Sequence, residues 1–186
     1  RKLKQIHEQF NITMVYVTHD QLEASTFADK IAVMYEGQIV QFGTPRELFE
    51  SPNHTFVGYF IGSPGMNLIP VQRTETGVEF DGLPLHIHPE LAKYAETSTS
   101  SNIKIGIRPE FVRLSNTPAD DSYECHVKYI EDLGTYRIVT LELGSQTLLA
   151  RIDEDQVIEG DTVHIGFPRQ WLKLYIDEFL VEGATE

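Results

Sequence analysis

Three titratable side chains near the start of the sequence, those of His19, Asp20 and Glu23, have types and spacing that could support chemistry. They follow Ile12–Val17, a short and mostly apolar run that is rich in β-branched residues and favours a strand buried on both faces. Because open α/β sheets present ligand-binding groups at the carboxyl ends of strands, we expect the imidazole of His19 to lie at such an end. Asp20 and Glu23 could form an acid–base pair, but carboxylates at a helix start favour capping.

Other side chains could bind metal or act as a nucleophile, but their surroundings favour simpler roles. His86 and His88 alternate along one strand, yet no third ligand stands at a useful spacing and Pro89 follows directly, which favours a solvent-facing pair. The run Asp153–Asp155 lacks the pattern of a calcium loop and favours an exposed acidic turn. The single Cys125 alternates with apolar neighbours, which favours a buried structural thiol. We therefore expect no metal site.

The net charge of −13 over 186 residues is unevenly distributed. Residues 1–62 carry 5 Lys and Arg against 7 Asp and Glu, whereas residues 63–186 carry 10 against 21. A region that acidic repels nucleic-acid phosphates and anionic membrane surfaces, so a nucleic-acid-binding barrel is disfavoured, although a basic protein surface could dock on it. The hydrophobic fraction of 41% is compatible with a packed core, and no apolar run approaches the roughly 20 residues that cross a bilayer.

Helical and extended patterns alternate in residues 1–62. Thr44, Pro45 and Glu47 form a helix start, with a cap, a proline in the first turn and the carboxylate of a capping box. Because one buried strand and a hairpin are too few for an α/β domain, we expect an incomplete α/β piece. The expected elements are helices over 2–10 and 21–28, strands over 31–35 and 38–42, and helices over 45–50 and 55–61.

The run Gly62–Gly65, which reads G-S-P-G, is the clearest domain boundary, because two glycines and a proline in four residues mark a linker. Beyond it, short strand patterns are separated by polar, glycine-rich turns, which argues for a β-barrel or sandwich over residues 63–186. We therefore predict a mostly β fold, in which a barrel follows the incomplete α/β piece. The expected strands are 67–73, 77–80, 83–87, 103–107, 111–114, 123–130, 136–143, 147–152, 162–167 and 172–176.

Several motifs, taken in order, carry a resemblance to a known family. Val17–Ala24 reads V-T-H-D-Q-L-E-A and resembles the switch-histidine segment of ABC transporter ATPase subunits, and the pattern continues over Ala28–Pro45. Phe60–Leu68 reads F-I-G-S-P-G-M-N-L and resembles the narrower group that imports sugars and glycerol 3-phosphate. Ile105–Glu110, which reads I-G-I-R-P-E, resembles a signature in that group's carboxy-terminal barrel. The resemblance covers nearly the whole chain.

The resemblance implies an OB-like TOBE regulatory barrel over 63–186 and the carboxy-terminal tail of an ATPase domain over 1–62. In such subunits the histidine at the position of His19 contacts the terminal phosphate of ATP, with Mg²⁺ present, and two subunits clamp two ATP molecules. The implied partners are a second copy of the subunit, the transmembrane permease subunits and a regulatory protein that docks on the barrel. The implied location is cytoplasmic, at the inner face of the cell membrane.

The linker and barrel motifs supply the remaining candidate residues. For Arg108 and its neighbours the residues themselves favour a turn with a structural Arg–carboxylate pair, whereas the resemblance favours a regulatory or interdomain contact. An alternative function is a small-ligand barrel that binds an oxyanion, as in related molybdate-type transporters, for which the candidate donors are Ser63, Thr135 and Arg137. The expected regulatory or interdomain residues are Gly62, Ser63, Arg108, Pro109 and Glu110.

The sequence departs from the family pattern in its catalytic motifs. It contains no G-x-x-x-x-G-K-[ST] phosphate loop and no L-S-G-G-Q-like run. Because phosphoryl transfer depends on that loop, its Lys and Mg²⁺, His19 alone cannot supply it. We therefore expect a carboxy-terminal piece of a transport ATPase that holds no cofactor and hydrolyses no ATP by itself. We also expect Ile12–Val17, which lacks sheet neighbours, to cause self-association or to pack on the barrel.

Overall fold

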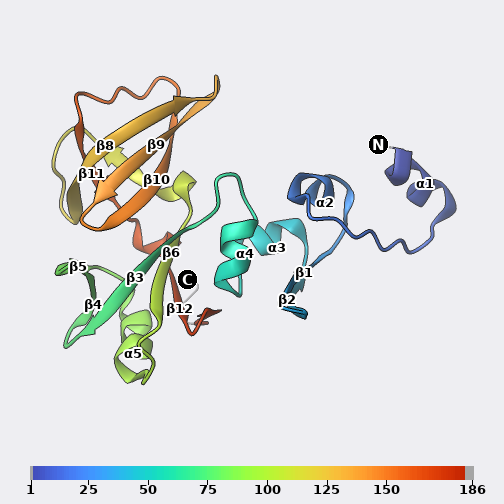
Figure 1. The fold of residues 1–186 in the computed structure, drawn as a ribbon, viewed down its shortest axis with the longest axis horizontal. Coiled ribbons are helices and arrows are strands. Elements are labelled where there is room, and N and C mark those ends of the chain that lie inside the picture. The colour runs from blue at the N-terminus through green and yellow to red at the C-terminus, as the bar shows by residue number, and fades with distance from the viewer. Residues whose placement is uncertain (1, 183–186) are drawn as a thin grey trace.

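The chain folds into an amino-terminal part of short elements and a larger body of antiparallel strands (Figure 1). The computed structural model describes residues 2–182. No helix among them is long and apolar enough to span a membrane. The elements expected over 2–10 and 21–61 are confirmed, with ends shifted by at most one residue. They are α1 Lys2–Phe10, α2 Gln21–Phe27, β1 Ile31–Tyr35, β2 Gln38–Gly43, α3 Pro45–Glu50 and α4 Thr55–Phe60.

The segment Ile12–Val17 is not a strand. It is an irregular connection between α1 and α2, and the side chains of Val15 and Val17 are each 90% exposed. The prediction of a buried strand is wrong because the backbone groups of a strand need a paired neighbour, and residues 2–182 offer none beside this segment. Leu22 on α2 is likewise 70% exposed. In Figure 1, α1 lies farthest from the strands.

We expect the chain to associate with itself through the apolar side chains of Ile12–Val17, because exposed apolar surface next to an unpaired backbone favours pairing between copies. Sedimentation velocity over a concentration series should show a dimer or larger species. The double substitution Val15→Asp, Val17→Asp should shift that species toward monomer. Val157→Asp is the matched control, because Val157 is 65% exposed on the barrel. A wild-type chain that stays monomeric at every concentration would contradict the prediction.

Side-chain caps fix the starts of α2 and α3. An oxygen of Asp20 accepts hydrogen bonds from the amides of Leu22 and Glu23 at 2.8 and 3.1 Å. The hydroxyl of Thr44 accepts from the amide of Glu47 at 3.2 Å, and the Glu47 carboxylate accepts from the amide of Thr44 at 2.8 Å. Both predicted helix starts are therefore confirmed, and each such cap stabilises its helix by about 1 kcal/mol.

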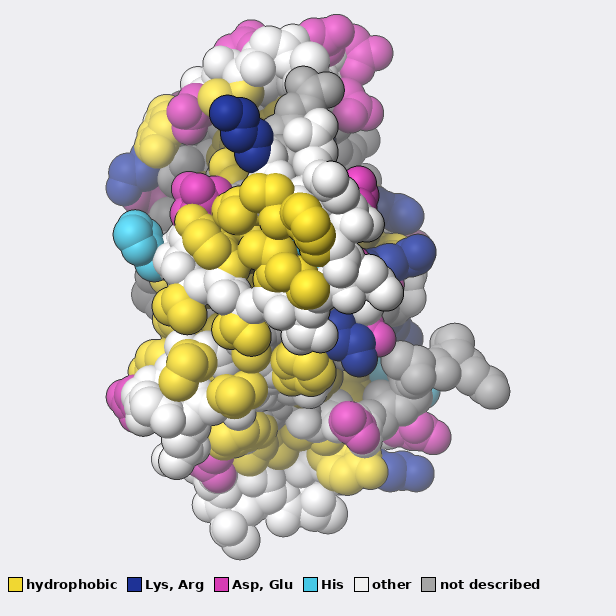
Figure 2. All heavy atoms as spheres, turned by 90° about the vertical axis from the view of Figure 1, so that its right-hand side faces the viewer, with side chains coloured by type: hydrophobic (Ala, Val, Ile, Leu, Met, Phe, Trp, Pro, Cys, Tyr) yellow, Lys and Arg dark blue, Asp and Glu magenta, His cyan; other side chains and the backbone are white. Residues whose placement is uncertain are grey.

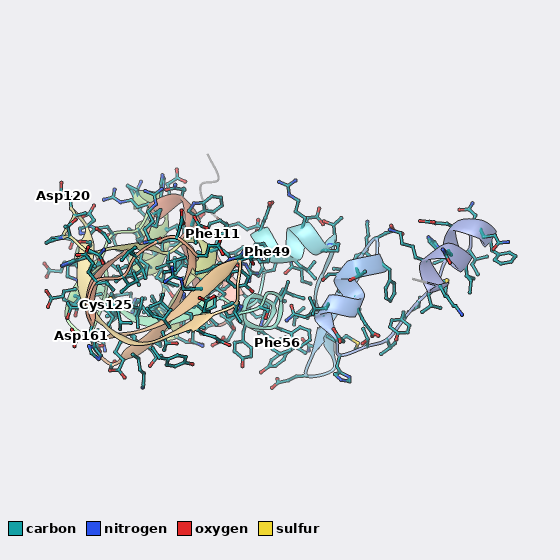
Figure 3. The ribbon with its side chains drawn as sticks, turned by 90° about the horizontal axis from the view of Figure 1, so that it is seen from above. Phe49, Phe56, Phe111, Asp120, Cys125 and Asp161 are labelled. Atoms are coloured by element: carbon teal, nitrogen blue, oxygen red, sulfur yellow. The ribbon has the colours of Figure 1, made fainter. Side chains whose placement is uncertain are left out.

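The elements β1, β2, α3 and α4 enclose a small apolar core of their own. The turn between the two strands holds Glu36 and Gly37 at φ of 48° and 78°, the left-handed values that a tight two-residue hairpin turn requires. In Figure 3, Phe49 lies where this unit meets the barrel, whereas the ring of Phe56 stacks on those of Tyr35 and Phe60 within the unit. The buried members of the core are Val33, Leu48, Val57 and Ile61, with Ile31, Val40, Phe49, Phe56 and Phe60 packed around them.

The larger body consists of two antiparallel sheets that share one apolar core. The six-stranded sheet has the order β13-β12-β6-β3-β4-β5, and the five-stranded sheet has the order β10-β9-β8-β11-β7. Helix α5, Pro89–Thr97, buries Leu91 and Ala95 in the core. The strands are β3 Asn67–Thr74, β4 Gly77–Phe80, β5 Leu83–Leu85, β6 Ile103–Ile107, β7 Arg113–Ser115, β8 Ser122–Asp132, β9 Tyr136–Leu143, β10 Gln146–Asp153, β11 Thr162–Gly166, β12 Lys173–Ile176 and β13 Phe179–Leu180.

The mostly β, OB-like fold class is confirmed. Each strand expected from the sequence is present, and β13 is a further strand that the sequence pattern does not predict. Ile69, Ile105 and Leu141 have no exposed surface, which places the centre of the core between the two sheets. Burial of one such side chain contributes about 1.5–3 kcal/mol.

Two stretches of the barrel repeat each other in sequence and structure. Residues 106–114 read G-I-R-P-E-F-V-R-L and residues 166–174 read G-F-P-R-Q-W-L-K-L. Each stretch runs from the end of one strand through a short 3₁₀ turn into the next, as β6 to β7 and as β11 to β12. Strand β6 pairs with β12 and β7 pairs with β11, and in both pairs the first residue of one repeat faces the eighth residue of the other. An approximate twofold axis therefore relates the two repeats.

Phe111 and Trp171 stand at the same position of the two repeats, in the 3₁₀ turns Pro109–Phe111 and Arg169–Trp171. Their rings stack with centroids 3.9 Å apart and planes inclined by 5°. Trp171 remains 40% exposed, so it covers the stack from outside.

Asn67 joins the two sheets at an edge. Its side-chain carbonyl accepts a hydrogen bond from the amide of Leu149 at 2.8 Å, and its side-chain amide donates to the carbonyl of Leu149 at 2.8 Å. Asn67 is 8% exposed. One buried side chain on β3 therefore satisfies both backbone groups of a residue on the edge strand β10, in the manner of a strand neighbour.

Candidate functional site

His19 lies in the exposed loop that leads into α2. The hydroxyl of Thr18 donates to the carboxylate of Glu23 at 3.0 Å and accepts from the amide of Asp20 at 3.0 Å. The hydroxyl of Tyr16 donates to the same oxygen of Glu23 at 3.3 Å, and the negative charge of Glu23 raises the pKa of Tyr16. Asp20 and Glu23 therefore act on loop shape and helix start, as the capping interpretation expected, and the imidazole of His19 faces solvent.

The surroundings of His19 do not fit ATP and Mg²⁺. Phosphates and a magnesium ion need clustered donors, cations and carboxylates, and the carboxylates of Asp20 and Glu23 are already engaged in the loop and the helix cap. Within residues 2–182, no group of three or more His, Cys, Asp or Glu side chains is placed to hold a metal ion.

Gln21, the first residue of α2, is tied to the linker at Gly62. The amide of Gly62 donates to the side-chain oxygen of Gln21 at 2.7 Å, and the side-chain amide of Gln21 donates to the carbonyl of Gly62 at 3.2 Å. This reciprocal pair places the start of α2, two residues after His19, directly on the segment that enters the barrel. The only sequence signal for Gln21 is its place in the V-T-H-D-Q-L-E-A motif, which was not enough to identify the contact.

Arg108, at the end of β6, is buried against the amino-terminal part with 2% of its surface exposed. Its Nε donates to the carbonyl of Phe49 at 2.7 Å, and its guanidinium lies 4.0 Å from the centre of the Phe49 ring. Its Nη1 donates to the carbonyls of Ile61 at 2.6 Å and Gly58 at 3.4 Å. These carbonyls belong to the carboxyl ends of α3 and α4, where a cation complements the helix dipoles.

The environment of Arg108 shifts its pKa in two directions. Burial lowers the pKa of Arg108, and the neighbouring carboxylate of Glu110 opposes that change. Among residues 2–182, Nη2 of Arg108 and Oε2 of Glu110 are buried without a hydrogen-bond partner. Glu110 lies 4.0 Å from Nη1 of Arg151, so its ion pair is made there and not with Arg108. The turn that the residues alone favoured is present, but its carboxylate pairs with Arg151 and not with Arg108.

The other predicted regulatory residues surround this contact unequally. Gly62 has φ of +113°, and a Cβ atom at Gly62 would lie 2.7 Å from Nη1 of Arg108. Pro109 is buried as the first residue of its 3₁₀ turn. Ser63 is exposed and precedes Pro64 through a cis peptide bond. The structure thus brings Gly62 and Arg108 together and leaves Ser63 outside the contact. A regulatory role for these residues stays a prediction.

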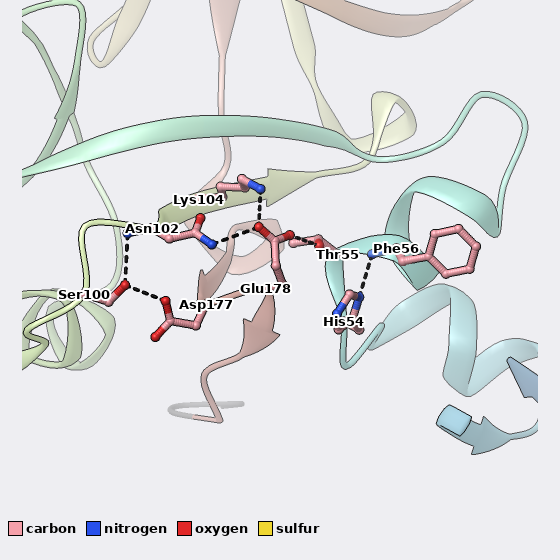
Figure 4. A network of polar contacts seen from close by, with 8 residues as sticks. All are labelled: His54, Thr55, Phe56, Ser100, Asn102, Lys104, Asp177 and Glu178. Atoms are coloured by element: carbon pink, nitrogen blue, oxygen red, sulfur yellow. Dashed lines mark hydrogen bonds and ion pairs between the residues drawn. The ribbon is translucent and has the colours of Figure 1, made fainter. Parts of the chain in front are cut away.

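A second contact joins α4 to the barrel through Glu178 (Figure 4). The side-chain amide of Asn102 donates to the Glu178 carboxylate at 3.0 Å, and Lys104 and Thr55 donate to the same carboxylate. The amide of Thr55 also donates to the carbonyl of Glu178 at 2.9 Å. The sequence did not identify Glu178, because its partners lie 74 or more positions away along the chain.

We expect this contact to weaken in acid. Burial acts to raise the pKa of Glu178, but the hydrogen bonds from Lys104, Thr55 and Asn102 lower it to about 2, from an ordinary value of 4.5. The ionised carboxylate therefore stabilises the fold above pH 4.5, and this stabilisation is lost as the pH falls through 4.5 to about 2. The free energy of unfolding should fall by about 2 kcal/mol across that window on account of this group.

Urea unfolding of the wild type and of Glu178→Gln between pH 2 and 5 measures that loss. The variant should show a shallower pH dependence than the wild type. Glu142→Gln is the matched control, because Glu142 accepts from Lys128 on an exposed strand face. An equal acid slope in the wild type and in Glu178→Gln would contradict the assignment.

Tyr175 and His54 also take part in the contact between the amino-terminal part and the barrel. The hydroxyl of Tyr175 donates to the carbonyl of Pro52 at 2.8 Å, and burial raises the pKa of Tyr175 well above its usual value. Nδ1 of His54 accepts from the amide of Phe56 at 3.0 Å, and its ring meets the ring of Phe179 edge-on. These side chains fix the segment before α4 against β12 and β13.

The remaining candidates take structural roles. His86 lies 3.2 Å from a carboxylate oxygen of Asp121, and His88 caps α5 through its ring nitrogen. The expectation of two solvent-facing histidines is confirmed, since both are exposed. Cys125 is buried, its thiol donates to the carbonyl of Val163, and burial raises the thiol pKa to about 11. The expectation of a buried structural thiol is therefore confirmed.

The donors suggested for an oxyanion do not converge. Ser63 lies in the linker and Thr135 in the exposed turn between β8 and β9, whereas Arg137 donates to the carbonyl of Glu154. A cavity of about 490 Å³ lies elsewhere, and none of these three donors lines it. Its charged and titratable lining consists of His86, Arg113, Asp120, Asp121, Tyr123, His164 and Arg169.

Comparison with known families agrees with this architecture. Residues 62–112 match the family described as MalK OB fold domain, and residues 105–174 match the TOBE domain family. The two matches together run from Gly62 through Arg108 to the end of β11 and into β12.

Individual relatives match the chain over a longer range, which also includes most of the amino-terminal part. The chain is 34% identical over 177 residues to the sn-glycerol-3-phosphate import ATP-binding protein UgpC 2 of Agrobacterium fabrum. This alignment covers 94% of the chain and 46% of that protein. It is 36% identical over 183 residues to the maltose/maltodextrin import ATP-binding protein MalK of Photorhabdus laumondii, with 95% and 49% covered.

A third relative, the sn-glycerol-3-phosphate import ATP-binding protein UgpC of Bordetella avium, is 37% identical over 171 residues, with 89% of this chain and 46% of that protein covered. The chain thus spans about half the length of the curated relatives it matches. It carries the MalK-type OB fold and TOBE domains, and over nearly its whole length it is similar to the carboxy-terminal part of MalK- and UgpC-type import ATP-binding proteins.

Proposed function

We propose that the chain is the carboxy-terminal regulatory portion of the ATP-hydrolysing subunit of an ABC importer for sugars or related solutes such as glycerol 3-phosphate. The observation that carries the proposal is the presence, in one chain, of the His19 segment and of a MalK-type OB barrel with a TOBE domain. The similarity to import ATP-binding proteins for glycerol 3-phosphate and maltose supports it. In the whole subunit, His19 contacts the terminal phosphate of ATP, and the barrel receives regulatory signals.

The exposed apolar surface of the amino-terminal part supports the proposal. Figure 2 shows hydrophobic side chains gathered on the face that carries this part. Because a contiguous apolar surface of this kind marks an interface, and because the relatives are about twice as long as this chain, we infer that the rest of an ATPase domain covers it. The exposed apolar residues include Val15, Val17, Leu22, Met34, Ile39 and Phe42.

The division into an ATPase tail over residues 1–62 and a barrel over 63–186 belongs to the same proposal. ATP and Mg²⁺ are then held by the part of the subunit that carries the phosphate loop, and the present chain contributes His19 to that site. The partners are a second copy of the subunit, the permease subunits and a regulatory protein on the barrel. The subunit works in the cytoplasm, on the inner face of the membrane.

The test uses the longer polypeptide that contains these residues. Its ATPase activity should be abolished by His19→Ala and retained in His126→Ala, which changes an exposed histidine on β8. The 186-residue chain alone should show no ATP binding by calorimetry. Unchanged activity in His19→Ala, or hydrolysis by the short chain, would overturn the proposal.

A further inference from the structure

We propose that Gln21 and Arg108 form a mechanical link that couples the barrel to the position of the His19 loop. The two side chains hold adjacent residues of the chain: Gln21 binds both backbone groups of Gly62, and Arg108 binds the carbonyl of Ile61 at the end of α4. The inference rests on the proposed function, because in that function the position of the His19 loop determines whether His19 reaches the terminal phosphate of ATP. Gln21 and Arg108 are positioning residues in this scheme.

On the barrel side, the link is stiff. The guanidinium of Arg108 is planar, is buried, and is held between the ring of Phe49 and the carbonyls of two helix ends. Arg108 follows the last residue of β6, which pairs with β3 on one side and β12 on the other. A change in the packing of these strands therefore moves the guanidinium, and with it the carbonyl of Ile61.

On the helix side, the link is equally direct. Gln21 uses both its donor and its acceptor on Gly62, so α2 cannot shift relative to the linker without breaking a hydrogen bond. Gly62 has no side chain to separate the contact made by Gln21 from the one made by Arg108, and a Cβ atom at Gly62 would clash with the guanidinium of Arg108. Asp20, which precedes Gln21, caps α2, and His19 precedes Asp20. The position of Gly62 therefore sets the start of α2 and the loop that carries His19.

A change at Arg108 should reach the start of α2 through the side chain of Gln21. Arg108→Lys keeps the charge but loses the planar fork, so it should shift the amide resonances of Leu22 and Glu23, which Arg108 does not contact. In a Gln21→Met background, the same substitution should leave those resonances unchanged, because the connection is already cut. NMR spectra of the 186-residue chain and its variants measure both effects.

Hydrogen exchange tests the contact between Gln21 and Gly62 directly. Gln21→Met should speed exchange of the Gly62 amide by about tenfold, whereas Gln21→Glu, which keeps the acceptor, should restore most of the protection. Phe49→Leu, which removes the ring that the Arg108 guanidinium packs against, is a milder change if Arg108→Lys fails to fold, and it should also shift the amide resonances of Leu22 and Glu23. Arg169→Lys is the matched control, because Arg169 is half-exposed in the equivalent 3₁₀ turn and pairs with Asp121.

Two results would overturn the link. One is an absence of shifts at Leu22 and Glu23 in both Arg108→Lys and Phe49→Leu. The other is a set of shifts of equal size with and without Gln21, which would mean that the effect spreads through the fold by another route.

In the longer subunit, Gln21→Met should lower kcat for ATP hydrolysis and leave KM for ATP unchanged, and Gln21→Glu should recover part of the rate. An inactive wild type, or an active His19→Ala, would refute the proposed function and leave the NMR test of the link standing. An active wild type that loses activity in His19→Ala but not in Gln21→Met would refute the link alone.

Discussion

Replacement of Arg108 by methionine is expected to lower the free energy of unfolding by about 3–5 kcal/mol. Methionine fills a similar volume but leaves the carbonyls of Phe49 and Ile61 buried without their charged donor. A hydrogen bond to a charged group is worth about 1.5–3 kcal/mol, and these two short bonds are lost together with the longer one to Gly58 and the cation–π contact on Phe49. Arg108→Lys should cost about half as much, since the ammonium can satisfy one carbonyl at a time.

Urea unfolding monitored by fluorescence measures this loss, because the chain contains one tryptophan, Trp171, which lies in the barrel. Arg169→Met is the matched control and should cost no more than about 1 kcal/mol, as expected for a half-exposed arginine with a surface ion pair. If Arg108→Met were as stable as that control, the guanidinium would not be what holds α3 and α4 to the barrel.

Replacement of Asn67 by aspartate should cost about 3 kcal/mol at pH 7, although the two side chains have nearly the same shape. The new carboxylate still accepts from the amide of Leu149, but it faces the carbonyl of Leu149 without a proton to donate. This places a negative charge at a site that is 8% exposed. Asn67→Ala should cost about 2 kcal/mol and should show no dependence on pH.

The pH dependence separates charge from shape. Burial beside a carbonyl raises the pKa of the introduced carboxyl above its usual value of about 3.9. The stability lost at neutral pH should therefore return as the pH falls through the raised pKa toward about 3.9, because the protonated acid can donate to Leu149. Asn116→Asp is the control: Asn116 makes the same pair of bonds, to Val157 and Glu159, but on an exposed loop. Equal costs at the two sites would contradict the argument from burial.

Local patterns predicted much of the fold because the physical cause is also local. Thr44 and Glu47 lie three residues apart and satisfy each other's backbone amides, so the start of α3 needs no distant partner. Glu36 and Gly37 specify a turn in the same way. Alternating apolar residues placed the strands of the barrel for a related reason, since one face of each strand must be buried.

Ile12–Val17 marks the limit of such reasoning. Its residues favour a buried strand, but burial requires neighbours, and residues 2–182 supply none for it. The same limit applies to Glu178 and Gln21, whose partners lie far away along the chain. For the candidate site, the motifs located His19, Gly62 and Arg108, but only the structure shows that the last two are in contact.

The pairing of the two repeats implies a definite order of folding. Strands β8, β9 and β10 pair with neighbours in sequence, so this meander can form early from local contacts. The pairs β6–β12 and β7–β11 should form later. Each joins one strand that precedes the meander in the sequence to one that follows it, and closing the long loop between the two strands has an entropic cost. Neither repeat can complete its sheet without the other. The stack of Trp171 on Phe111 should therefore form late, and tryptophan fluorescence should follow the slow phase of refolding.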